Sequence, residues 1–222
     1  MHVFKRFLAV SVVALLFSTA NAVEITQAPL GNGGGKLSMA PNAGYQVAEN
    51  FQFANDVSLT KISWWGSYDG SPLNPESFIV RIFEDNGSSD PKTAFLRETG
   101  FSGGGSSTAF VDAYNANVYR YDITLPSVLA LTGGVDYYLS VYLNDSIGDP
   151  DNWYWLEGAS GDTTGWSRAL DTDSWTKNNQ TLNMSYRLTA DPVAAVPTPA
   201  TLLLMLPAML WFGRRYILKS KD

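Results

Sequence analysis

The sequence predicts an all-β protein folded as an antiparallel β-sandwich, of jelly-roll or immunoglobulin-like kind. Three observations support this fold class. Helical periodicity is scarce between residues 23 and 190. Apolar and polar residues alternate there in short segments, the pattern of strands with one buried face. Segments rich in Gly, Asn, Asp, Ser and Pro separate these strands, as antiparallel strands joined by turns require. A closed barrel is the alternative architecture.

The alternation is clearest in three segments, at 118–125, 136–144 and 181–189. In each of them every second residue is aliphatic or aromatic, so one face is expected to be buried and the other wet. The segments 57–66 and 78–83 are apolar on both sides, which indicates central strands. The remaining candidate strands are 45–53, 107–114, 152–158 and 165–170.

Residues 1–22 have the pattern of a secretory signal peptide. Lys5 and Arg6 precede an apolar run, and Ala20 and Ala22 provide the small residues before a cut at Val23. We therefore expect an exported protein with a flexible lead-in at 23–44 and a sandwich at 45–190. A Pro/Ala linker follows at 191–199, because proline favours extended backbone.

Charge and composition exclude several functions. Residues 23–195 hold 20 Asp or Glu and 9 Lys or Arg, a net charge of −11, which opposes binding to nucleic acid. Neutral sugars and divalent cations remain compatible with this charge. Cysteine is absent, and His2 in the signal peptide is the only histidine. The mature chain therefore lacks the residues of a Ser-His-Asp triad, a Cys-His pair or a Cys/His zinc site, and we expect no enzyme of these classes.

The segment 200–212 is apolar apart from Thr201 and precedes Arg214 and Arg215. As a helix it would extend about 20 Å, short of the ~30 Å hydrocarbon core of a bilayer. It is therefore expected to hold the chain in the inner membrane transiently, with the arginines on the cytoplasmic side. A lasting C-terminal membrane anchor is the alternative.

The motif VPTP, with Val196, Pro197 and Pro199, precedes this apolar segment and the pair Arg214 and Arg215. Together they resemble the PEP-CTERM sorting signal of Gram-negative bacteria. The resemblance implies that an exosortase, an integral membrane enzyme, recognises and processes the tail, and that the protein reaches the cell envelope or extracellular matrix. Thr198 departs from the family pattern, which has Glu at this position.

The order of motifs WWG, FIVRIFEDNG and YYLSV in the central region resembles a β-sandwich module of exported bacterial proteins with such tails. This second resemblance implies a fold and an exported location. It assigns no catalytic residues.

Tryptophans are the first candidate for a binding site. Exposed aromatic rings bind sugars, and the candidates are Trp153 and Trp155 together with Trp64 and Trp65. Trp153 and Trp155 share one face of their strand, opposite Tyr154. The alternative is that these rings fill the core between two sheets.

The loop 144–152 is the second candidate, because Asp145, Asp149 and Asp151 could supply oxygen ligands to Ca²⁺. Its spacing differs from that of an EF-hand, and an ordinary solvated turn is the alternative. No other cofactor is expected.

These observations favour a non-enzymatic exported β-sandwich that binds or organises exopolysaccharide. A secreted carbohydrate-active enzyme with two carboxylates is the alternative, with Glu84, Asp85 and Glu157 as candidates. A purely structural surface protein is a third hypothesis, and it is favoured if all the tryptophan rings are buried.

Overall fold

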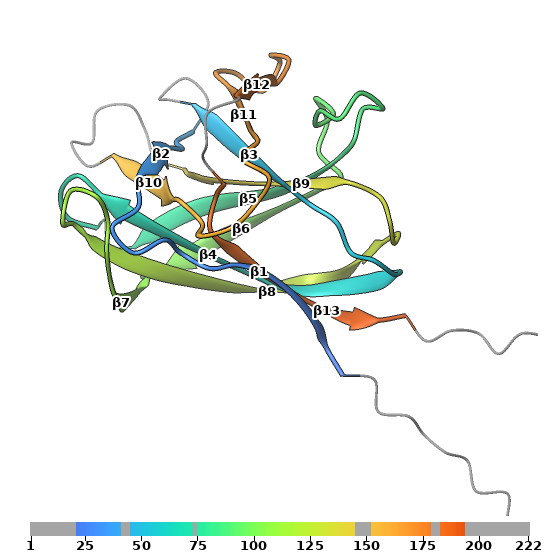
Figure 1. The fold of residues 1–222 in the computed structure, drawn as a ribbon, viewed down its shortest axis with the longest axis horizontal. Coiled ribbons are helices and arrows are strands. Elements are labelled where there is room, and N and C mark those ends of the chain that lie inside the picture. Colours follow the sequence, from blue (N-terminus) through green and yellow to red (C-terminus); the bar gives the residue numbers. More distant parts are fainter. Residues whose placement is uncertain (1–20, 41–44, 73–74, 145–151, 179–182, 194–222) are drawn as a thin grey trace, which may run out of the picture.

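The computed structural model describes residues 21–40, 45–72, 75–144, 152–178 and 183–193. Within this part the regular structure is entirely β-strand, in two antiparallel sheets that pack face to face (Figure 1). The prediction of an antiparallel two-sheet β protein is confirmed. The apolar tail and all but the last two residues of the predicted signal peptide lie outside the described residues. None of the described segments forms a helix long and apolar enough to cross a membrane.

Sheet I has β4 at its centre, paired with β13 and then β10 along one side and with β8 along the other. β1 and β2 extend the first side, and β7 extends the second. Its strands are β1 (Val23–Gln27), β2 (Gly35–Leu37), β4 (Val57–Tyr68), β7 (Ser106–Val111), β8 (Asn117–Leu131), β10 (Trp153–Leu156) and β13 (Tyr186–Pro192).

Sheet II has the strand order β12-β11-β3-β9-β5-β6. Its strands are β3 (Gln46–Phe51), β5 (Glu76–Glu84), β6 (Arg97–Gly103), β9 (Tyr137–Leu143), β11 (Gly165–Arg168) and β12 (Thr176–Asn178). The segments predicted to be central strands from their two apolar faces are β4 and β5, and each has neighbours on both sides.

Aromatic and aliphatic side chains fill the space between the sheets, so the core forms from the inward faces of both. Trp64 of β4 stacks on Tyr121 of β8 with ring centroids 5.4 Å apart. Trp153 of β10 meets Phe78 of β5 edge-on at 4.9 Å. The predicted inward face of β8 is confirmed, since Tyr121 and Leu125 are buried in this core.

A β-bulge at Thr60 decides which residues of β4 face outward. The register with β8 shifts between Leu59 and Lys61, and the hydroxyl of Thr60 donates to the carbonyl of Thr189. One extra residue reverses the alternation, so Leu59 before the bulge and Ile62 after it both point into the core. Lys61 and every second residue after it therefore face outward.

The expectation of a flexible lead-in at 23–44 is wrong for the described part of that segment. β1 pairs with β13 over Val23–Gln27, and β2 pairs with β10 over Gly35–Leu37. β1 covers the free edge of β13. The main-chain N–H and C=O groups of β1 thereby gain hydrogen-bond partners that a short exposed strand would lack.

Both ends of the described chain leave the sandwich at the same end. Val23 of β1 lies opposite Ala190 of β13, and Figure 1 shows both strands ending on one side of the molecule. β4 starts at this end, where Val57 pairs with Pro192. It then runs for about 30 Å to Tyr68 at the opposite end.

Candidate functional site

The four tryptophans predicted as a sugar platform are buried. Trp64, Trp153 and Trp155 are 0% exposed and lie in the core, and Trp65 is 5% exposed. Trp65 packs on the outer side of sheet I with Val118 and Leu156. The hypothesis of an exposed tryptophan surface is therefore corrected: these rings fill space within the fold, because aromatic side chains contribute most when they are removed from water.

Two contacts show how closely the tryptophans of β10 are packed. The indole nitrogen of Trp155 donates to the carbonyl of Ser185 over 2.8 Å. A Cβ atom at Gly66 would lie 2.4 Å from the ring of Trp153, so the indole fits only because residue 66 has no side chain.

The residues proposed as calcium ligands, Asp145, Asp149 and Asp151, lie outside the described residues. In the part of the chain that is described, no group of three or more His, Cys, Asp or Glu could hold a metal ion. The end of that loop is nevertheless well defined. Asp69 accepts hydrogen bonds from the backbone and side-chain nitrogens of Asn152, at 2.8 and 2.7 Å, so this carboxylate joins the end of β4 to the start of β10.

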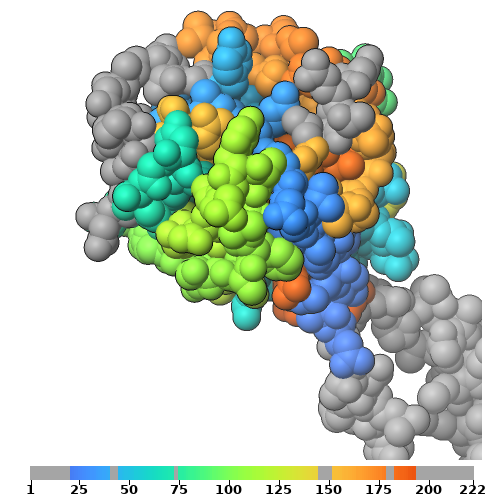
Figure 2. Space-filling model, turned by 60° about the vertical axis from the view of Figure 1, so that its left-hand side comes forward, coloured from blue at the N-terminus to red at the C-terminus, as the bar shows by residue number. Residues whose placement is uncertain are grey.

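A groove of about 450 Å³ lies at the end of β4, on the side of the molecule away from the two chain ends. Its walls come from β2, β4, β10 and the turn between β7 and β8, several of which appear side by side in Figure 2, with the end of β4 in teal and that turn in yellow-green. We call it the tyrosine groove, and it is lined by Gly35, Tyr68, Asp69, Asp112, Tyr114, Ala116 and Tyr154.

Asp112 fixes the wall that carries Tyr114. One of its carboxylate oxygens accepts the backbone N–H groups of Tyr114 and Ala116, each at 2.9 Å, and the other accepts the hydroxyl of Ser67 at 2.7 Å. Asn115 completes the turn with a left-handed φ of 65°. The ring of Tyr114 is 89% exposed although its backbone is held in place.

Tyr154 forms the opposite wall. It lies between Trp153 and Trp155 in sequence, so its side chain leaves β10 on the outward face while theirs point into the core. A Cβ atom at Gly35 would lie only 2.9 Å from the Cβ of Tyr154, so β2 approaches β10 this closely because residue 35 has no side chain. Partial burial, and then the nearby charge of Asp69, raise the pKa of Tyr154, which keeps its hydroxyl protonated.

The tyrosine groove therefore combines aromatic surface with carboxylates that retain acceptor capacity. Asp69 accepts hydrogen bonds from Asn152 and from the hydroxyl of Tyr154, and a carboxylate has about four acceptor sites, so capacity remains. Such a site suits a neutral ligand with apolar C–H faces and many hydroxyl donors. It holds no histidine or cysteine, since the sequence has no cysteine and its one histidine is His2.

The carboxylates considered for hydrolysis follow or end strands of different sheets, and each one accepts a hydrogen bond within the chain. Glu84 of β5 accepts the amine of Lys92 at 2.6 Å, and Asp85 accepts the backbone N–H of Gly87. Glu157, which follows β10, accepts the backbone N–H of Gly34 at 2.7 Å. These contacts support turns and loop crossings, so nothing in them indicates a catalytic pair.

The outer face of sheet II is covered, although the alternation in β9 predicts a wet face there. Tyr138, Ser140 and Tyr142 of that face are all buried. Trp166 contacts Tyr138 edge-on at 4.8 Å, and Trp175 contacts Phe83 at 5.2 Å. Trp166 belongs to β11 and Trp175 directly precedes β12, and such long-range contacts leave no mark in the local pattern.

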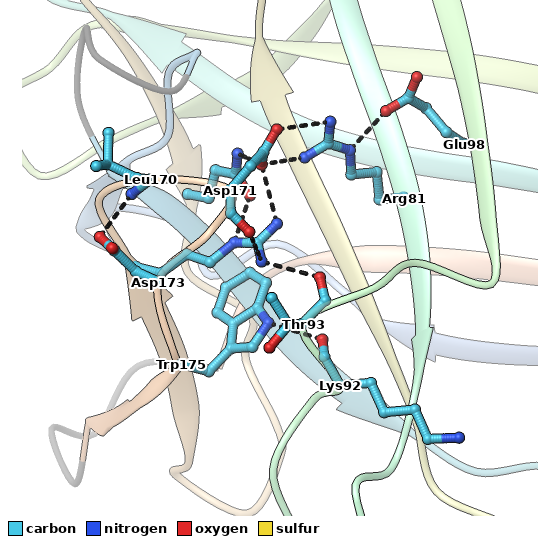
Figure 3. A network of polar contacts seen from close by, with 10 residues as sticks. Arg81, Lys92, Thr93, Glu98, Leu170, Asp171, Asp173 and Trp175 are labelled. Carbon is cyan, nitrogen blue, oxygen red and sulfur yellow. Dashed lines mark hydrogen bonds and ion pairs between the residues drawn. The ribbon is translucent and has the colours of Figure 1, made fainter.

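Two buried arginines share one carboxylate on this covered face (Figure 3). Asp171 accepts hydrogen bonds from Arg81 of β5 and from Arg168 of β11. Arg81 also pairs with Glu98 at 2.7 Å, and Arg168 donates to the carbonyl of Thr93 at 3.1 Å.

Aromatic rings lie against both guanidinium groups of this arginine network. Tyr142 lies 5.1 Å from that of Arg81, and Trp175 lies 4.4 Å from that of Arg168. Because every charge in the network has a partner within the chain, it is suited to holding loops on sheet II, not to binding a ligand.

Sequence reasoning missed both Tyr114 and Tyr154. The available signal was the alternation in WYWL: when two tryptophans share a face, the tyrosine between them lies on the other. Tyrosine is better suited than tryptophan to the solvent-facing side of the strand, because its hydroxyl group can stay hydrated there. No local pattern distinguishes Tyr114, whose position depends on a turn fixed by Ser67 some 45 residues earlier.

In comparison with known protein families, residues 26–197 match a family model described as Domain of unknown function (DUF7901). No match to the sequence was found among curated proteins.

Proposed function

This chain belongs to the DUF7901 family, and we propose that it is an exported, non-enzymatic surface protein that binds neutral polysaccharide through the tyrosine groove. Its tail is processed by an exosortase, and the sandwich is then placed in the cell envelope or extracellular matrix.

The position of the tyrosine groove is the observation that carries this proposal. The C-terminal linker starts where β13 ends, and the groove lies at the other end of β4, about 30 Å away. While the tail holds the chain at the inner membrane, the groove therefore points away from the bilayer. A saccharide would pack its C–H face on Tyr154 or Tyr114 and donate hydroxyls to Asp69.

Export is supported by the signal-peptide pattern and by the resemblance of the tail to PEP-CTERM signals. β1 starts at Val23, the first residue after the expected cut. Cleavage there would release a complete edge strand and remove none of the sandwich. Val193, the last described residue before the tail, is 52% exposed, as a linker leaving the folded body requires.

A purely structural role is the second candidate function. Its supporting observation is that all six tryptophans of the sandwich are at most 8% exposed. A protein with a purely structural role in an envelope layer does not need an exposed aromatic site for a ligand.

A glycan array of neutral oligosaccharides, probed with the native mature protein, tests the binding proposal. We expect binding that falls at least about tenfold in Tyr154→Ala, the loss of roughly 1.4 kcal/mol of contact energy. Tyr154→Phe should retain most of the affinity, because it keeps the ring. Tyr45→Ala is the matched control, since Tyr45 is 57% exposed and does not line the groove. Equal binding by all variants would place the saccharide site outside the tyrosine groove, and no binding by the wild type would favour the structural role.

A further inference from the structure

A second groove crosses the outer face of sheet I, nearer the chain ends. It encloses about 340 Å³ and is lined mainly by polar side chains. We call it the basic groove, and its lining is Glu24, Lys61, Ser63, Arg120, Asp122, Ile123, Thr124, Arg187 and Thr189.

The register of the strands arranges these side chains in two rows. Ser63 of β4 lies between Arg187 of β13 and Asp122 of β8. Two residues earlier, Lys61 lies between Thr189 and Thr124. Directly opposed residues are about 5 Å apart, so the cations and hydroxyls form one continuous surface.

Two of the three cations have no internal partner. Arg120 pairs with Asp122, which also accepts the hydroxyl of Ser63 at 2.6 Å. Within the described part of the chain, the side chains of Lys61 and Arg187 form neither an ion pair nor a hydrogen bond.

The nitrogen Nε of Arg187 is moreover buried without a hydrogen-bond partner in this part. A buried, unpaired donor is costly, and an acceptor in the groove would relieve that cost.

The charge of the domain limits what this acceptor can be. Residues 23–195 carry a net charge of −11, yet three of their nine Lys and Arg side chains line the basic groove. Glu24 and Asp122 line the groove as well, and Asp122 pairs with Arg120, so Lys61 and Arg187 are the cations left to attract a carboxylate. At physiological ionic strength this attraction acts over about 8 Å. A densely charged polyanion or an anionic bilayer would also meet the acidic remainder of the surface and be repelled.

We propose that the basic groove binds the carboxylate of a uronic acid that occurs sparsely in an otherwise neutral polysaccharide. Arg187 and Lys61 hold the carboxylate, because guanidinium and ammonium groups form strong charge-assisted hydrogen bonds with it. Ser63 donates to Asp122 and Thr189 donates to Glu24, so their oxygens, together with that of Thr124, can accept hydrogen bonds from neighbouring sugar hydroxyls. This inference rests on the proposed function in that the ligand is a saccharide, and it adds a second subsite with a charge requirement.

The test compares cellobiouronic acid with cellobiose, which differ by one carboxylate, in titrations of the mature protein followed by NMR. We expect the uronic acid to bind at least about tenfold more tightly, the usual worth of one charge-assisted contact. The double variant Lys61→Gln/Arg187→Gln should remove this preference and leave cellobiose binding unchanged. Lys177→Gln is the control, because Lys177 lies on β12 of the other sheet.

Three outcomes would overturn the inference: equal affinity for both disaccharides, a preference that survives the double variant, or binding to anionic phospholipid vesicles with none to the uronic acid. Loss of cellobiose binding alone in Tyr154→Ala would support the inference, because the uronic acid would still bind at the basic groove. A carboxylate preference without any effect of the tyrosine variants would contradict the proposed function and leave the basic groove as the only saccharide site.

Discussion

The hydroxyl of Tyr121 donates a 2.6 Å hydrogen bond to the carboxylate of Glu76 between the two sheets, where each residue is 1% exposed. Tyr68 donates to the same oxygen at 2.6 Å, and the backbone N–H of Gly105 donates to the other at 2.7 Å. Burial, followed by the nearby Tyr68 and Glu76, raises the pKa of Tyr121 and keeps its hydroxyl a donor.

Tyr121→Phe is expected to lower the free energy of unfolding by about 2 kcal/mol, because a buried carboxylate loses one of its donors. Urea unfolding followed by tryptophan fluorescence measures the change. Tyr119→Phe is the matched control on the same strand, and it should change stability by less than about 0.5 kcal/mol. Equal effects of the two substitutions would show that the bond to Glu76 adds nothing.

Glu49 predicts a pH dependence of stability. Burial raises its pKa from 4.5 to about 8, although hydrogen bonds from Met184 and Gln27 act in the opposite direction. The folded protein therefore binds a proton that the unfolded chain releases, and stability falls as pH rises from 4.5 to 8. Through Glu49 the free energy of unfolding falls by at most about 1.4 kcal/mol per pH unit in this range.

Glu49→Gln removes the titrating group and keeps a neutral side chain of the same size. We expect the decline in unfolding free energy between pH 5 and pH 8 to become shallower in this variant, as measured by chemical denaturation at each pH. Parallel curves for wild type and variant would mean that Glu49 is ionised in the folded protein at neutral pH.

Asp171→Ala leaves Arg81 and Arg168 without their shared carboxylate. Burial alone would raise the pKa of Asp171, but hydrogen bonds from Arg81 and Gln46 outweigh burial and lower the pKa. The ionised carboxylate therefore stabilises the fold at neutral pH, and this stabilisation is lost only in acid. At neutral pH we expect Asp171→Ala to lower the free energy of unfolding by about 2 kcal/mol. This is less than for a fully buried ion pair, because the side chain of Asp171 is 45% exposed. Glu84→Gln, which breaks an exposed pair with Lys92, should cost below about 1 kcal/mol in the same assay.

Gly66→Ala is expected to destabilise the protein by about 1–3 kcal/mol, because the new methyl group would overlap the ring of Trp153. Gly100→Ala is its control, since a Cβ there meets no atom within 4 Å. Differential scanning calorimetry of the two variants should show a lower melting temperature for the first alone. A matching decrease in both would point to a general effect of replacing glycine in a strand.

The sequence predicts the strands well where one face is buried by sheet-on-sheet packing. The alternation in β8 and β13 identifies Tyr121, Leu125, Tyr186 and Leu188 as inward residues, and all four are buried in the core. Their pattern is local, and it depends only on the two-residue period of a strand.

Two parts of the fold depend on distant contacts and could not be predicted in this way. β1 looks too short and polar to be a strand alone, and it exists because β13 offers a free edge. The buried outer face of β9 depends on Trp166 of β11 and on Trp175 directly before β12, both of which come later in the chain.

The candidate site was only partly predictable. Alternation correctly places Trp153 and Trp155 on the same face, but it does not say which face is the core when both faces of β10 are aromatic. The choice is made by Gly66 of the neighbouring strand, whose missing side chain admits the indole of Trp153. Tyr154 is thereby left to line the tyrosine groove.

The central claim is that an exported sandwich is freed of both chain ends and displayed with its groove outward. Intact mass spectrometry of the protein isolated from the surface of its native cells tests this claim most directly. The account predicts a chain that starts at Val23 and ends within the linker at 191–199, alone or with a further group attached there. A mature protein that retains residues 200–222 would contradict it.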